Sequence, residues 1–174
     1  MRSLLLLLVA GIAHASPPAI LPPVEIGVGK AAIATAHDSY TATEITVGLS
    51  WASLVPYSTA VDIGLGWLGS YSADNMHDAS GVYASFAMRC AERSHVRAWF
   101  GVRGELLYTE ERGVLGLAAR GSLELWRGVE WFDQGGGVGG SLGLTVFVDA
   151  IVREGQTRAV VAGIGGRLPM FAAK

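Results

Sequence analysis

The chain has 174 residues, of which 51% are hydrophobic, only 16% are charged and 24 are glycine. This composition argues against a disordered or coiled-coil chain. The net charge of −2 leaves no basic surface that would indicate a nucleic-acid partner. The mean hydropathy of +0.39 is high for a water-soluble domain. Beyond the N-terminus, however, no apolar run approaches the ~18 residues that a membrane-spanning helix needs.

The N-terminus has the layout of a secretory signal peptide. A positive start at Met1 and Arg2 precedes an apolar core at 4–12, and Ala13, His14 and Ala15 fit the A-x-A cleavage pattern. The core is too short to span a membrane as a helix. We therefore expect three segments: a signal peptide at 1–15, a short lead-in at 16–23, and a single domain at 24–171.

Alternating apolar and polar residues fill most of the chain after Pro23. Strict alternation over about ten residues indicates a β-strand, because successive side chains of a strand point to opposite faces. The windows that alternate are 24–33, 43–54, 60–69, 81–91, 96–107, 114–126, 137–149 and 159–168. The sequence therefore predicts an all-β domain of eight strands.

Charged residues in these windows gather on the polar face, and Lys30 is the exception. Lys30 stands near a strand end, where its long side chain can reach a polar surface. The polar-face set contains nearly equal numbers of acids and bases: Glu25, Glu44, Asp62, Arg89, Arg97, Arg103, Glu105, Arg120, Glu124, Asp149 and Arg167. We predict that this face lines a narrow lumen in which the charges pair. Glycines on the same face would make room for the long side chains.

The connections and the aromatic residues fit a barrel that crosses a membrane. Odd-numbered connections are predicted to be the longer and more polar ones, apart from a short fifth and a long sixth, which is typical of outer loops and periplasmic turns. These connections are 34–42, 55–59, 70–80, 92–95, 108–113, 127–136 and 150–158. Aromatic residues at strand ends are predicted to form two interfacial girdles. They are Trp51, Tyr57, Trp67, Tyr71, Trp131 and Phe132.

With these features the chain resembles the small eight-stranded outer-membrane β-barrels of Gram-negative bacteria, over about 24–171. The tail at 164–171 is similar to the family's assembly signal, which ends in an aromatic residue, here Phe171. It departs from that signal because Pro169 interrupts the alternation and three residues follow Phe171.

The resemblance implies an eight-stranded antiparallel up-and-down transmembrane β-barrel in the outer membrane. We expect contact with outer-membrane lipid, a monomeric state and no cofactor. The expected role is non-enzymatic, either structural or in surface interaction, with a surface partner reached through the outer loops.

Two alternative functions stay open at this point. Some barrels of this family act on lipid A, and His37 and Ser39 superficially resemble their catalytic pair, with Glu44 as an orienting acid. Alternatively, a soluble exported barrel could bind an apolar ligand. In that case the faces would be inverted, with the apolar side inside and the charged side in water.

Other motifs carry weaker signals. Two glycine patterns, at 27–32 and 64–69, fit dinucleotide-binding fingerprints but lack the strand-then-helix context that the motif needs. The oxygen and imidazole groups of Asp74, Asn75, His77 and Asp78 could hold a divalent ion, although flexible polar loops often have this composition, and we predict no metal. Cys90 is the only cysteine, so an internal disulfide is excluded, and we expect it to pack as a small hydrophobe.

Overall fold

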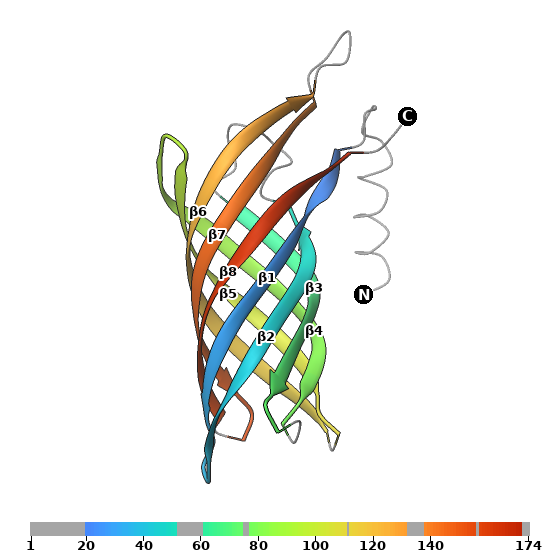
Figure 1. Cartoon of the computed structure of the whole chain (residues 1–174), viewed down its shortest axis with the longest axis vertical. Helices are drawn as coiled ribbons and strands as arrows, with labels where there is room; N and C mark the ends of the chain where they lie inside the picture. Colours follow the sequence, from blue (N-terminus) through green and yellow to red (C-terminus); the bar gives the residue numbers. More distant parts are fainter. Residues whose placement is uncertain are drawn as a thin grey trace.

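The computed structural model describes residues 20–51, 61–74, 77–110, 112–131, 138–155 and 157–171. Eight strands in sequence order form a closed barrel, and each pairs antiparallel with its neighbours (Figure 1). They are β1 (Ile20–Ala34), β2 (Ser39–Ser50), β3 (Val61–Ser72), β4 (Ala79–Arg93), β5 (Val96–Tyr108), β6 (Gly113–Trp131), β7 (Val138–Arg153) and β8 (Thr157–Phe171). The predicted fold is therefore confirmed. No helix in the described ranges is long and apolar enough to cross a membrane.

The two ends of the barrel are distinguished by the connections and chain termini found there. We call the end with the β1–β2, β3–β4, β5–β6 and β7–β8 connections the loop end. The opposite end, where β1 begins and β8 finishes, is the terminal end (Figure 1).

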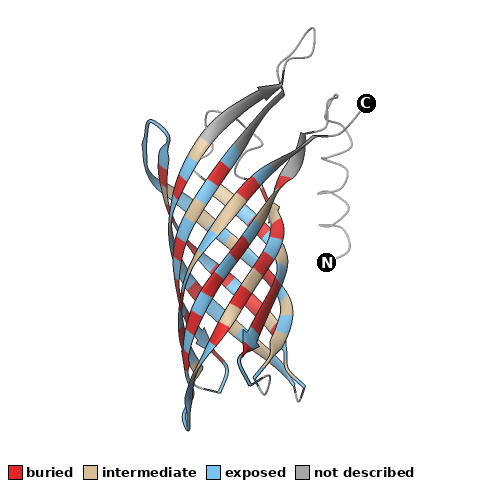
Figure 2. Ribbon diagram, viewed as in Figure 1, coloured by how far each residue is buried: buried red, intermediate tan, exposed pale blue. Residues whose placement is uncertain are grey.

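Burial alternates along the strands, and the pattern is inside out (Figure 2). The outward positions carry large apolar side chains that are exposed, such as Leu117 at 62% and Val148 at 53%. The inward positions carry buried charges, such as Arg103 and Asp149. The alternation that predicted the strands thus also separates an apolar outer surface from a charged interior.

Strand stagger fixes the width of this interior. Moving around the barrel from partner to partner, the path that leaves β1 at Ala34 returns to β1 ten residues away, at Val24. It runs through Arg158, Val152, Leu117, Gly104, Ala84, Leu65 and Leu49. Eight strands with this stagger tilt by about 40° to the barrel axis. A barrel of this size encloses a space just wide enough for side chains to fill.

The outer apolar band has a defined height. On β7 it runs from Leu142 to Val152, and on β6 from Leu115 to Leu125. Each strand contributes ten residue steps, so a rise of about 3.3 Å per residue and the tilt give a band roughly 25 Å tall.

The predicted asymmetry of the connections is wrong. Short connections, at 35–38, 73–78, 109–112 and 154–156, stand at the loop end, whereas the longest one, at 51–60, stands at the terminal end. Strands continue beyond the apolar windows because ladder pairing needs only backbone hydrogen bonds. On β1 and β2, for example, pairing extends to Ala34 and Ser39 with small and polar side chains.

β1 and β8 pair to close the barrel, and both contain prolines where this pairing nears the terminal end. The register shifts between Leu21 and Val24, where Pro22 and Pro23 supply no N–H donors. Pro169 lies opposite this irregularity, yet pairing resumes with Leu21 against Met170 and Ile20 against Phe171. The tail is therefore the closing strand of the barrel.

We predict opposite effects for two glycines on the two faces. Gly143 is buried, and a Cβ there would meet the Glu124 carboxylate, with Cγ and Cδ 3.2 Å away. Gly121 faces outward, with nothing within 4 Å of such a Cβ. Gly143→Ala should therefore reduce the free energy of unfolding in lipid vesicles by about 1–3 kcal/mol. Gly121→Ala should leave that free energy unchanged or raise it slightly. Equal losses in the two variants would contradict the assignment of faces.

Candidate functional site

Two groups of paired charges lie deep in the lumen. We call the group nearer the loop end the upper network, with the loop end taken as the top of the barrel, opposite to its placement in Figure 1. It consists of Glu44, Arg103, Glu105, Arg120, Asp149 and Arg153. The lower network, toward the terminal end, consists of Asp62, Glu124 and Arg167. Because these residues come from several different strands, their bonds tie opposite walls of the barrel together.

The upper network is electrically balanced, with three arginines and three carboxylates. Arg103 donates to Glu105 at 2.6 and 2.9 Å and pairs with Asp149 at 3.1 Å. Arg153 donates to Glu44 at 2.6 Å and to Glu105 at 3.0 Å. A further arginine, Arg120, holds both oxygens of Asp149, at 2.7 and 2.8 Å. Such two-pronged bonds between a guanidinium and a carboxylate are among the strongest hydrogen bonds in proteins.

The lower network depends on Arg167, whose Nη2 lies 2.7 Å from Asp62 and whose Nη1 lies 3.1 Å from Glu124. The indole N–H of Trp99 donates to the other Glu124 oxygen at 2.9 Å. Glu25 stands beside this group, where it lines a cavity of about 40 Å³ together with Arg167 and other residues.

A third cluster lies at the terminal ends of β4 and β5. Glu92 pairs with Arg89 and accepts a bond from Arg97 Nε at 3.1 Å. The Arg97 guanidinium also lies over the Trp126 ring, 3.6 Å from its centroid. Arg97 is buried and Arg89 is partly exposed, so the predicted lumen charges extend to this opening of the barrel.

Two kinds of lumen residue were missed from the sequence. Arg153 falls in the predicted connection 150–158, whereas in the structure the inward positions of β7 continue from Asp149 through Ile151 to Arg153. Large apolar side chains also point inward and were not anticipated. They are Ile33, Leu68, Leu107, Phe147, Ile151 and Val161.

The aromatic residues predicted for the girdles have different surroundings. Trp67 and Tyr71 are exposed on the outer face, at 37% and 40%. Trp51 is half-buried just after β2, and the Trp131 backbone belongs to β6. Tyr57 and Phe132 lie outside the described residues. Tyr108, which is 57% exposed at the loop end of β5, was not anticipated.

The alternative catalytic set is not assembled. Both oxygens of Glu44 face arginines inside the lumen, Arg153 at 2.6 Å and Arg103 at 3.4 Å. His37 and Ser39 are exposed in and beside the β1–β2 connection, where their backbone N–H groups bond to Thr35 and Asp38. Glu44 is therefore not available as an orienting acid.

The polar residues of the β3–β4 connection serve its own structure. Asp78 accepts the Ser72 backbone N–H at 2.8 Å, and Asp74 accepts the Ser72 hydroxyl at 2.6 Å. The His77 ring stacks on Tyr40, with the ring centroids 4.3 Å apart. Asn75 lies outside the described residues. Within the described ranges, no group of three or more His, Cys, Asp or Glu residues is placed to hold a metal ion.

Two smaller expectations are also resolved. The glycine patterns lie inside β1 and β3 and not between a strand and a helix. The expectation that Cys90 packs as a small hydrophobe is wrong, because it is an exposed free thiol near the terminal end of β4.

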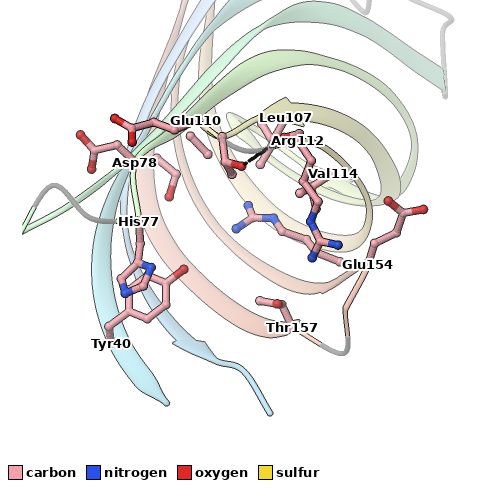
Figure 3. Close-up of a pocket in the computed structure, with 13 residues that line it drawn as sticks. Tyr40, His77, Asp78, Leu107, Glu110, Arg112, Val114, Glu154 and Thr157 are labelled. Atoms are coloured by element: carbon pink, nitrogen blue, oxygen red, sulfur yellow. Dashed lines mark hydrogen bonds between the residues drawn. The ribbon is translucent and has the colours of Figure 1, made fainter. Parts of the chain in front are cut away.

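A pocket of about 490 Å³ opens at the loop end, above the upper network (Figure 3). It is formed by β2 to β8 and three of the short connections. Its lining residues are Tyr40, Ser70, His77, Asp78, Ala79, Leu107, Thr109, Glu110, Arg112, Val114, Arg153, Glu154 and Thr157. This volume lies in the range of about 300–1,000 Å³ that is typical of small-molecule sites. We call it the mouth pocket.

No protein-family model and no curated sequence matches the chain. The fold is similar to the crystal structure of Neisserial surface protein A, with a TM-score of 0.61. The match covers 85% of this chain and 96% of that one at 10% sequence identity. At this identity the similarity concerns the fold. The resemblance to small eight-stranded outer-membrane barrels is thus confirmed at that level.

We predict that Arg103→Met strongly destabilises the barrel. The variant leaves the buried carboxylates of Glu105 and Asp149 with fewer cationic partners, and breaking a buried pair costs about 3–5 kcal/mol. Arg158→Met is the control, because Arg158 is exposed on β8. Urea unfolding in lipid vesicles measures both variants. A loss for Arg103→Met no larger than that of the control would show that the network does not contribute to stability.

Proposed function

We propose that the chain is a small outer-membrane β-barrel with a non-enzymatic structural or surface-interaction role and a largely filled interior. It contacts outer-membrane lipid as a monomer and meets a surface partner through the loop end. The terminal end faces the periplasm. The signal peptide at 1–15 directs export.

The inside-out distribution of side chains carries this proposal. A soluble barrel that binds an apolar ligand needs an apolar interior and a charged exterior. Here the exterior presents exposed leucine, valine and phenylalanine side chains, while Arg103, Glu124 and Asp149 are buried. Such a surface would be unfavourable in water but suits lipid.

The size and edges of the band support the same conclusion. A height of roughly 25 Å matches the apolar band of outer-membrane barrels. Lys30, the cation on the outward face of β1, donates a hydrogen bond from its ammonium to the Thr43 hydroxyl at 2.8 Å. Tyr71, Tyr108 and Arg158 stand near the loop ends of their strands, where amphipathic and charged side chains suit a membrane interface.

The filled lumen supports a role other than transport. Arginine–carboxylate bonds cross the interior at two levels, and apolar side chains occupy further inward positions. Eight strands leave space only for such side chains. We therefore expect the purified protein to add no steady conductance to a planar bilayer.

Cell fractionation tests the proposed location. The protein should be recovered in the outer membrane and should change its mobility on a detergent gel after heating, as closed barrels do when they unfold. Recovery as a soluble periplasmic protein without a mobility change would overturn the proposal.

A pair of arginine substitutions tests whether the band meets lipid. Val148 lies near the middle of the β7 band and Val152 at its loop end, and both are exposed, at 53% and 60%. In a membrane, Val148→Arg should cost about 2–4 kcal/mol of folding free energy and Val152→Arg about 0–1 kcal/mol. Vesicle-based unfolding provides the measurement. In a soluble barrel both substitutions would be nearly neutral, so the absence of a depth effect would contradict a lipid-facing band.

A further inference from the structure

We infer that the mouth pocket binds a small organic anion, with a carboxylate or phosphate group held between Arg112 and Arg153. This inference goes beyond the proposed function, since it concerns the interior of the loop end and not the lipid-facing surface.

Arg112 supplies the first cation of the pocket lining. It comes from the β5–β6 connection, and among the described residues its hydrogen bonds are those of its backbone N–H and C=O groups with Thr109. Its guanidinium forms no ion pair with any residue in the described ranges. Instead the side chain extends across the opening (Figure 3). Its Nη2 approaches Gly155 in the β7–β8 connection and would lie 3.2 Å from a Cβ atom placed on that glycine.

Arg153 supplies the second cation, in the floor of the pocket. Its Nε and Nη2 are used by Glu105 and Glu44, which hold the guanidinium in place. Its Nη1 forms no bond with the described residues, although the side chain lines the pocket. With Nε and Nη2 engaged in this way, Nη1 is the donor left for a carboxylate or phosphate oxygen of a ligand.

The acidic residues of the lining do not occupy the centre of the pocket. Asp78, Glu110 and Glu154 lie at its edges with their carboxylates directed away from the Arg112 guanidinium (Figure 3). Asp78 is held by the Ser72 backbone N–H at 2.8 Å, and Glu154 accepts the Leu115 N–H at 3.3 Å. Within the described ranges no carboxylate pairs with the Arg112 guanidinium, so an anionic group of a ligand can take that place.

The other lining residues indicate which chemical groups the rest of the ligand should carry. Ser70 and Thr157 offer hydroxyl groups, and Ser70 is buried. Leu107 and the stacked rings of Tyr40 and His77 contribute apolar and aromatic surface to the pocket wall. The volume of about 490 Å³ admits more than an inorganic ion. An anionic group attached to a flat or apolar body fits these surroundings.

Four probes of similar size test this inference: phenyl phosphate, benzoate, benzamide and benzylamine. The full chain is refolded in detergent, and the amide resonances of Gly155 and Thr157 are followed by NMR during titration. Phenyl phosphate and benzoate should bind saturably, and the tighter of the two identifies the preferred anionic group. Added inorganic phosphate and raised salt concentration should both weaken their binding. Benzamide or benzylamine binding as tightly as benzoate, or no saturable shift with any probe, would overturn the inference.

Arg112→Gln provides the matching variant test. Loss of this guanidinium should weaken benzoate binding about 10-fold or more, because it removes charge-assisted bonds. Arg158→Gln, an exposed position on the outer face of β8, should change binding less than about 2-fold, since such surface charges are screened. Heat-dependent gel mobility verifies that each variant forms the barrel, so the result is independent of where the protein resides. Equal binding by wild type and Arg112→Gln would exclude the assigned anion site.

Discussion

Pairing of charges across a narrow, closed lumen is the constraint on which the rest of this structure depends. Arg103 on β5 reaches carboxylates of β2 and β7, and Arg153 on β7 reaches those of β2 and β5. A buried ion is costly when it is unpaired, so each arginine requires its partners to be in place at the same time. The ion pairs therefore fix which strands face each other across the interior. The backbone hydrogen bonds fix only which strands are neighbours.

This constraint explains why glycine is so frequent. A lumen of eight strands with a stagger of ten residues cannot hold long charged side chains at every inward position. Gly143 leaves space for the Glu124 carboxylate, and Gly48 leaves space for the Tyr83 hydroxyl. On the outer face, a Cβ at Gly121 would have no neighbour within 4 Å, whereas Gly69 lies against the rings of Trp67 and Tyr71. Inward glycines thus make room for the side chains that fill the lumen.

Alternation made the eight strands and their faces predictable from sequence, because a period of two is a local property. The ends of the strands were less predictable, since pairing at Ala34 or Arg153 depends on a neighbouring strand and not on local hydropathy. Inward Leu68 and Ile151 were missed because the apolar or polar character of a residue does not reveal which face it occupies when the lumen is partly apolar. The mouth pocket was also beyond sequence reasoning. It joins Tyr40, Arg112 and Arg153 from connections and strands far apart in the chain.

The mouth pocket and the upper network share Arg153, and this links the two parts of the loop end physically. Glu44 and Glu105 neutralise Arg153 from below and hold its guanidinium at the floor of the pocket. The floor of the pocket is therefore made of paired charges held in place from the lumen side. Arg112, in contrast, is exposed in a short connection, and no residue in the described part of the chain holds its guanidinium. A ligand held between these two arginines would meet one preorganised group and one that gains its partner only on binding, so the ligand would order the β5–β6 connection more than the barrel wall.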